Sequence, residues 1–174
     1  EMLDKNFNAP LTSSAGRLFD AASALLNIKP VAQKEAEAAI ELERSALKFI
    51  GKAYAYPFKI RKKDGLFLVD ILPTFRQMAK DMGQKKSVSE IAYRFHLTIA
   101  QATIHVCGLL KKIYSINNVY CSGGVFMNSI LTEELKKSMP KAGFSVYFAK
   151  RPYTTDLGIS QGQIAACLME KQRN

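Results

Sequence analysis

The residues with the clearest chemical potential surround two adjacent glycines, Gly123 and Gly124. They stand between a short apolar run that predicts a strand and a segment that predicts a helix over about 125–139. Glycines at such a junction let the backbone approach a ligand closely, with N–H groups facing a phosphate or a ribose. A tight turn chosen for packing is an equally good interpretation, because the sequence matches neither a Rossmann turn nor a P-loop.

Two carboxylates are further candidates. Gly16 and Asp20 lie one turn apart on one face of a predicted helix, where a carboxylate can hold a ribose hydroxyl. The pattern favours the alternative, in which Asp20 lies on the surface of an N-capped amphipathic helix. Asp156 precedes a glycine-rich helix start and can either bind a metal or cap that helix. The cap is favoured, since an acidic residue at a helix N-terminus needs no further explanation.

Histidine and cysteine spacing predicts no self-contained site. His96 and His105 are nine residues apart on one predicted helix, so they point about 180° away from each other and cannot bind one ion together. His96 can face a cleft, although a hydrogen-bonded core histidine is the favoured interpretation. The three widely spaced cysteines match no metal or disulfide pattern, and we expect them to be reduced and mostly buried. Spacing alone assigns no catalytic residue.

These residues must be positioned by alternating helices and short strands. Helices are predicted from Thr12 or Ser13 to 27, over 31–50 and 71–83, from Ser87 or Ser89 to 114, over 125–139, and from about 158 onward. Strands are predicted at 54–60 and 66–69, joined by a basic turn at 61–65, and at 119–121 and 144–148. The longest helix carries apolar residues on two opposite faces, which predicts a central position. A β-α-β order with flanking helices indicates an α/β fold.

Composition sets the broad class. The chain has 174 residues, of which 48% are apolar, enough for one domain or one lobe with a sizeable core. The net charge of +10 is dispersed or lies at helix ends, which favours a solvated surface over a nucleic-acid site. No apolar run reaches membrane length and no secretory leader opens the chain, so we expect a cytoplasmic protein. Because the chain opens on glutamate rather than methionine, we expect a missing upstream part, with residues 1–11 as a linker and 12–174 as one lobe.

Five segments, taken in order, resemble one family, the hydrogenase maturation carbamoyltransferases of the HypF type, with relatives that carbamoylate antibiotics. The resemblance covers nearly the whole chain and rests on residues 12–21, 35–43, 94–96, 122–128 and 156–163. It implies the C-terminal lobe of an actin/Hsp70/sugar-kinase-like domain, with a central sheet flanked by helices.

The resemblance also implies an activity. In the family another domain prepares carbamoyl-AMP from carbamoyl phosphate and ATP. The domain resembled here binds that adenylate and transfers the carbamoyl group to the C-terminal cysteine thiol of a partner protein in [NiFe]-hydrogenase maturation. The implied partners of this lobe are therefore the upstream lobe and domains of its own parent protein, and that acceptor protein.

The resemblance assigns roles to residues. It places Gly123, Gly124 and Asn128 against the nucleotide, and Gly16 and Asp20 near its ribose.

It also places Asp156 on a divalent metal, iron or zinc, whose two histidine ligands belong to an upstream HxxxH motif. This chain has no HxxxH, so the metal is expected only in the complete domain and the fragment is expected to be inactive alone.

The chain departs from the family pattern at two places, and these departures keep alternatives open. The family's Glu-Gly-Gln is Glu35-Ala36-Glu37 here, and its Asn-Asp-Gly-Gly is Thr155-Asp156-Leu157-Gly158. Ala36 adds a methyl group and Leu157 adds bulk beside the expected ligand. The alternatives are a lobe of an O-carbamoyltransferase that acts on a small-molecule hydroxyl, and a non-catalytic nucleotide-binding module.

Overall fold

The computed structural model describes residues 2, 4–5, 7, 10–149 and 155–171. Its elements, in chain order, are α1 (Ala15–Leu25), α2 (Glu37–Ala46), β1 (Lys59–Lys63), β2 (Leu66–Asp70), α3 (Leu72–Gly83), α4 (Val88–Tyr114), β3 (Asn118–Cys121), the 3-10 turn η1 (Gly124–Met127), α5 (Ser129–Ser138), η2 (Pro140–Ala142), β4 (Ser145–Phe148), η3 (Asp156–Gly158) and α6 (Ile159–Lys171).

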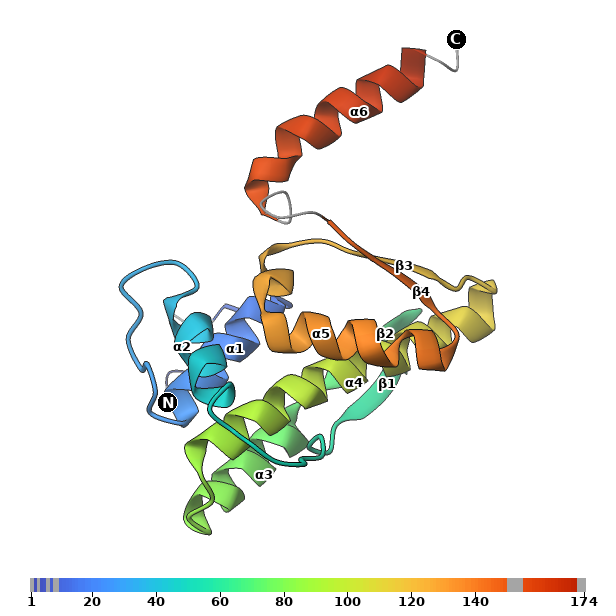
Figure 1. Cartoon of the computed structure of the whole chain (residues 1–174). Coiled ribbons are helices and arrows are strands. Elements are labelled where there is room, and N and C mark those ends of the chain that lie inside the picture. Colours follow the sequence, from blue (N-terminus) through green and yellow to red (C-terminus); the bar gives the residue numbers. More distant parts are fainter. Residues whose placement is uncertain (1, 3, 6, 8–9, 150–154, 172–174) are drawn as a thin grey trace.

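The 27-residue helix α4 is the centre of the molecule. The Ser87 hydroxyl accepts a hydrogen bond from the Glu90 N–H at 3.2 Å, which identifies Ser87 as the N-cap. Lys111 and Lys112 lie in the last turn, where cations suit the helix dipole. Helices α1, α2, α3 and α5 all contact α4 (Figure 1). The central position predicted from its two apolar faces is therefore confirmed.

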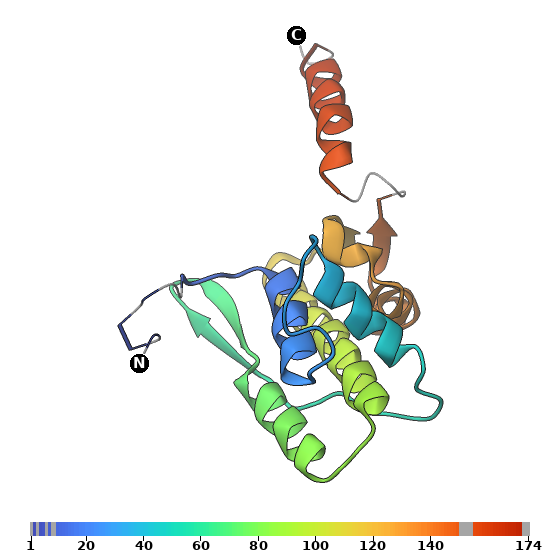
Figure 2. The ribbon, with the colours of Figure 1, turned by 90° about the vertical axis from the view of Figure 1, so that its left-hand side faces the viewer.

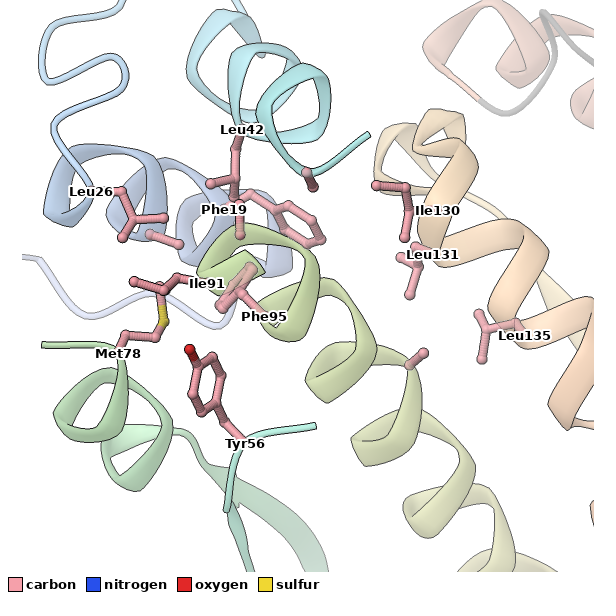
Figure 3. Packing of buried hydrophobic residues seen from close by; sticks show 14 of the residues in the cluster. Phe19, Leu26, Leu42, Tyr56, Met78, Ile91, Phe95, Ile130, Leu131 and Leu135 are labelled. Carbon is pink, nitrogen blue, oxygen red and sulfur yellow. The ribbon is translucent and has the colours of Figure 1, made fainter. Parts of the chain in front are cut away.

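The core forms around the first half of α4. Phe95 is fully buried, and its ring meets Phe19 of α1 edge-on at 5.2 Å and Phe75 of α3 at 6.0 Å between centroids. Leu42 of α2 and Leu135 of α5 fill further sides of the same cluster (Figure 3). Each such side chain contributes about 1.5–3 kcal/mol by leaving water. These contacts join α1, α2, α3 and α5 to α4 in one body.

Two short sheets accompany the helices. β1 and β2 form an antiparallel hairpin, whereas β3 and β4 run parallel, with Val119 opposite Val146 and Tyr120 opposite Tyr147. Helix α5 connects the two parallel strands, so the predicted β-α-β unit and the α/β class are confirmed. Tyr120 and Tyr147 stack at 4.9 Å between ring centroids on the more exposed face of this pair.

The hairpin differs from its prediction. Arg61–Lys63, expected in the turn, belong to β1, and the turn consists of Asp64 and Gly65 alone. Both turn residues have positive φ, 50° and 79°, as in the two-residue turns whose twist matches antiparallel strands. Residues 54–58, expected in the first strand, lie outside it, and the Tyr56 N–H instead donates to the Thr98 hydroxyl at 2.7 Å.

Several helix boundaries also differ. α1 follows Ser14 rather than Thr12 or Ser13, and the Thr12 hydroxyl accepts the Ser14 N–H. α2 is much shorter than expected, because Ala36 before it adopts φ 57°. α3 ends at Gly83 as predicted, and the backbone reaches positive φ only at Lys85.

The C-terminal helix lies apart from the other helices (Figures 1 and 2). All residues of α6 are exposed, including Ile164, Leu168 and Met169. Cys167 is exposed too, while Cys121 is buried and Cys107 half-buried, so the expected burial of the cysteines fails in α6. No helix in the described part of the chain combines the length and apolarity needed to span a membrane.

Candidate functional site

The loop between β3 and α5 has the backbone geometry that the glycine pair predicts. Gly123 adopts φ 106° and ψ 158°, a conformation that residues with a Cβ rarely adopt. Ser122, Gly123 and Gly124 are exposed, and a Cβ at either glycine would meet no atom within 4 Å. Among the residues that the structure describes, neither glycine amide donates a hydrogen bond to the protein. The loop therefore presents free N–H groups to open space, as a bound phosphate or ribose requires.

Asn128 supports this loop from inside the protein. It is the N-cap of α5, with its side-chain oxygen accepting the Leu131 N–H at 2.9 Å. Its amide nitrogen lies 3.0 Å from Nε2 of His96, and its backbone N–H donates to the Val125 carbonyl. The side chain is buried. Its contacts are thus with the protein, and direct contact between Asn128 and a nucleotide stays a prediction.

Two further side chains fix the same junction. One carboxylate oxygen of Glu43, from α2, accepts hydrogen bonds from both the N–H and the hydroxyl of Ser129, the former at 2.6 Å. The Thr132 hydroxyl donates to the Phe126 carbonyl at 3.0 Å. The first turn of α5 and the end of η1 are therefore tied to each other and to α2.

The start of α1 lies beside the loop. A Cβ at Gly16 would lie 4.0 Å from the Val125 side chain and 3.6 Å from the Ser14 hydroxyl. Asp20, one turn later, is partly exposed and pairs with Arg17 at 3.3 Å. The structure therefore brings the Gly16 segment together with the glycine loop. Contact between Asp20 and a ribose stays a prediction, because its carboxylate already has a cation beside it.

A cavity opens at the carboxyl ends of the two parallel strands, next to the loop. This is the edge of a parallel sheet where ligands characteristically bind. Here the Ala149 N–H donates to the Cys121 carbonyl, and this hydrogen bond joins the two strands at their carboxyl ends. The cavity measures about 420 Å³ and is lined by Phe126, Ser129, Thr132, Glu133, Lys136, Phe148 and Ala149. Its mixed aromatic and charged lining suits a group with both an apolar face and polar edges.

Cys121 carries the thiol nearest the loop in sequence, and its surroundings make it unreactive. Burial raises the pKa of its thiol, and the nearby Cys107 acts in the same direction. The thiol is therefore protonated at neutral pH, whereas the thiolate is the reactive form. Cys121 serves as packing at the end of β3.

Asp156 lies elsewhere, as the exposed first residue of η3, which leads into α6. It follows the N-cap residue Thr155 and is not itself the cap. In the described part of the chain, no three histidine, cysteine or acidic side chains gather closely enough to hold a metal ion. His96 is buried in the core, while His105 is exposed and packs on the Phe58 ring. A metal at Asp156 would need ligands from outside these residues.

Sequence reasoning found the loop but not its support. Glu43 lies within the helix predicted over 31–50, and spacing does not mark it as a support because its partner Ser129 is 86 residues away. The sequence allows His96 to face a cleft or to lie in the core, and the structure confirms the favoured interpretation, the core. The cap at Asn128 was detectable, because asparagine before serine is a common helix start. The predicted effect of Leu157 on the ligand concerns a side chain outside the described part of the chain.

Comparisons with known proteins point to one family. A family model described as carbamoyltransferase, Kae1-like domain, second subdomain, matches residues 1–163. The probable carbamoyltransferase HypF of Methanocaldococcus jannaschii is 31% identical over 168 residues, covering 97% of this chain and 21% of that protein. The carbamoyltransferase HypF homolog of Cupriavidus necator is 30% identical, covering 93% of this chain and 42% of that protein.

Solved structures agree with the sequence relatives. The crystal structure of a full-length HypF in a phosphate- and nucleotide-bound form matches 93% of this chain with a TM-score of 0.85 and 33% identity, over 21% of its own length. HypF of T. kodakarensis matches 98% of this chain with a TM-score of 0.79 and 26% identity, over 22% of its length. The chain thus spans between a fifth and about two-fifths of the length of these relatives.

Proposed function

Because this chain belongs to the Kae1-like carbamoyltransferase family of the HypF proteins, we propose that it forms the nucleotide-binding lobe of a carbamoyltransferase. The family and the α/β lobe that the sequence resembles are thereby established. The proposed ligand is carbamoyl-adenylate. The proposed acceptor is the C-terminal cysteine thiol of a partner protein in [NiFe]-hydrogenase maturation.

One observation carries this proposal. The Ser122–Gly124 loop presents unpaired backbone N–H groups among the described residues, at the carboxyl end of a parallel strand pair and beside a cavity of about 420 Å³. A nucleotide needs both features, since its phosphate takes N–H donors and its base takes a cavity with an aromatic face and polar edges. That a HypF relative was crystallised with phosphate and nucleotide supports the same assignment.

The chemistry of transfer explains why binding groups dominate this site. The acceptor thiolate attacks the carbonyl carbon of carbamoyl-AMP, a new S–C bond forms, and the bond from carbon to the phosphate oxygen breaks. AMP leaves with the electron pair, and the thiol proton passes to water or to a base. AMP is already a good leaving group, so the protein contributes chiefly by holding the carbamoyl-adenylate, excluding water and stabilising charge at the carbonyl.

The same proposal assigns the partner of α6. Its side chains Ile164, Leu168 and Met169 are each more than half exposed, an unusual state for neighbouring large apolar residues on one helix. We propose that the upstream lobe of the parent protein covers them. That contact would also bring other metal ligands to Asp156, at the start of this segment.

The test is a calorimetric titration of ATP, then of a stable carbamoyl-adenylate analogue, into the chain and into Gly124→Val. A valine at Gly124 points into open space in the free protein, so it should leave the fold intact and weaken binding at least tenfold by blocking the loop. Gly83→Val, at the end of α3 and also in open space, is the matched control and should bind as the unmodified chain does. Equal affinity of all three proteins would refute binding at this loop.

The non-catalytic nucleotide-binding module is the second candidate. The polar side chains under the loop favour it, because Glu43, His96 and Asn128 all form hydrogen bonds with other protein groups. These side chains are therefore not free to act on a substrate. Carbamoyl transfer to a thiol peptide by the parent protein, measured with and without Gly124→Val, separates the two candidates. Nucleotide binding without any transfer supports the module.

A further inference from the structure

A buried polar chain runs from α4 to the glycine loop. The His96 Nδ1 lies 2.7 Å from the Ala92 carbonyl, and its Nε2 lies 3.0 Å from the side-chain nitrogen of Asn128. The Asn128 oxygen then accepts the Leu131 N–H at 2.9 Å. His96 has no exposed surface and Asn128 has 7%. Three elements are thereby linked by side chains that water does not reach.

The direction of each hydrogen bond in this chain is determined. A carbonyl oxygen only accepts hydrogen bonds, so Nδ1 of His96 is protonated and donates a hydrogen bond to the Ala92 carbonyl. The Asn128 oxygen faces a backbone N–H, so its nitrogen is the group that faces His96 and donates. Nε2 must therefore be the acceptor, which requires a neutral imidazole. Burial lowers the pKa of His96 and outweighs the opposing effects of the Ala92 carbonyl and of Glu43.

The charged surroundings of His96 are simple. Phe19 of α1 meets its ring edge-on at 5.2 Å, and Asn128 faces it from the α5 side. Glu43 of α2 is the charged group that acts on it within the described part of the chain, and this carboxylate is occupied by Ser129. A protonated His96 would keep Nδ1 bonded but would direct a second N–H at the Asn128 donor. The hydrogen bond to Asn128 would then be lost.

Asn128 connects the hydrogen bond from His96 to the backbone of the loop. It follows η1 directly, and its backbone N–H donates to the Val125 carbonyl at 3.1 Å. Its side chain starts α5 through Leu131. Asn128 therefore joins the end of η1, through its backbone, to the start of α5 and to His96, through its side chain, so that losing the His96 bond loosens the residue that connects the two elements. The exposed Gly123 and Gly124, which have no side chain to hold them, depend on this support.

We infer that His96 is a positioning residue, which holds the Ser122–Met127 loop in its nucleotide-receiving form through Asn128. This inference rests on the proposed binding of an adenylate at that loop. His96 does not contact the ligand or the reacting atoms. It acts as a hydrogen-bond acceptor, so the loop is held only while its imidazole is neutral.

Three variants of the chain separate this role from simple packing. His96→Leu removes the acceptor and should weaken ATP binding about fivefold to tenfold, the effect of one hydrogen bond. His96→Gln restores an acceptor oxygen that does not titrate, so its affinity should stay within about threefold of the unmodified chain. Thr98→Val is the matched control, because Thr98 is also buried on α4 but bonds Tyr56, away from the loop; it should lose stability without losing affinity.

The pH dependence gives a readout that packing would not change. As the pH falls through the lowered pKa of His96, the unmodified chain should lose affinity for ATP faster than His96→Gln, and the comparison cancels the titration of ATP itself. In Asn128→Asp the pattern should reverse, because a carboxylate accepts from a protonated imidazole and raises the pKa of His96. Equal pH profiles for the unmodified chain and His96→Gln would overturn the inference.

NMR separates failure of this inference from failure of the proposed function. The ¹⁵N shifts of His96 should show a proton on Nδ1 and none on Nε2, and the amide signals of Gly123 and Gly124 should shift or broaden in His96→Leu but not in Thr98→Val. Should the chain bind no ATP while these signals respond, the binding proposal fails and the positioning role stands. Unchanged glycine signals in His96→Leu would reject the positioning role whether or not ATP binds.

Discussion

Two segments of this protein carry different parts of the predicted site, the glycine loop for the nucleotide and Asp156 for the metal, and the structure supports them to very different degrees. The η1 loop is exposed at Gly123 and Gly124 but rests on side chains from three helices. Asp156 starts a segment whose helix, α6, is exposed along its whole length. Both are glycine-rich helix starts in the sequence, so the sequence alone does not separate them.

The difference shows which half of the predicted site, the nucleotide loop or the metal carboxylate, is held in place by contacts within this chain. A loop whose supporting hydrogen bonds are all made within the chain can hold its ligand geometry before the ligand arrives, which lowers the entropic cost of binding. A carboxylate on an unpacked segment has no such preparation. We therefore expect nucleotide binding to be a property of this lobe, and metal binding to require the parent protein.

The largest test of the comparison removes Phe95, the fully buried aromatic residue at the centre of the helical core. Phe95→Ala should lower the free energy of unfolding by about 3–5 kcal/mol, because it leaves a cavity and removes the ring contacts that Phe95 makes with Phe19 and Phe75. Urea denaturation followed by circular dichroism measures this change. A loss below about 1 kcal/mol would mean that α4 does not organise the body.

A second test compares two carboxylates, Asp81 in the body and Asp156 in the exposed segment. Asp81 is fully buried and accepts hydrogen bonds from Tyr56, Gln77, Lys86 and Arg94. Asp81→Asn should lower the free energy of unfolding at pH 7 by about 3 kcal/mol, since charged hydrogen bonds are lost and a buried cation is left. Asp156→Asn should leave it unchanged. Denaturation of both variants in urea measures the contrast.

The pH dependence of Asp81 follows from its partners. Burial alone would raise its pKa, but the hydrogen bonds from Gln77, Tyr56 and Lys86, with the charge of Arg94, hold the pKa of Asp81 below its usual value. A depressed pKa gives stability that is fully present above the unfolded value, about 3.9, and is lost as the pH falls through the folded value. The unmodified chain should therefore lose its advantage over Asp81→Asn below about pH 4. A constant difference down to pH 2 would contradict this account.

A third test separates the two glycines of the loop. Gly123→Ala should lower the free energy of unfolding by about 1–3 kcal/mol, because φ 106° is strained for any residue with a Cβ. Gly124→Ala should change it by less than about 0.5 kcal/mol, since its φ is ordinary and its surroundings are open. Thermal unfolding measures both variants. Equal values would show that the loop adopts other conformations in solution.

The sequence predicted those parts of the fold that depend on local pattern. The two faces of α4, the Ser87 cap and the β3-α5-β4 order were all readable, because capping and periodicity act over a few residues. The start of α2 was not, since Ala36 takes a left-handed conformation with no local requirement for it. The positions of Gly16 and the glycine pair were predicted, but the bond between Glu43 and Ser129 joins residues too far apart for any spacing rule.

The smallest expected effect tests the exposed segment itself. Leu168 is 58% exposed on α6, whereas Leu135 on α5 is fully buried. Leu168→Ala should change the free energy of unfolding by less than about 0.5 kcal/mol, and Leu135→Ala should lower it by about 2–5 kcal/mol. Urea denaturation of the two variants measures the contrast directly.

The outcome for Leu168→Ala decides how the comparison is understood. A loss above about 1 kcal/mol would mean that α6 packs on the body in solution, so that Asp156 is positioned by this chain after all. A negligible loss in this chain, together with a clear loss for the same substitution in the parent protein, would show that the remaining lobe buries α6. Asp156 would then acquire its position only when the two lobes meet, while the glycine loop already has its own.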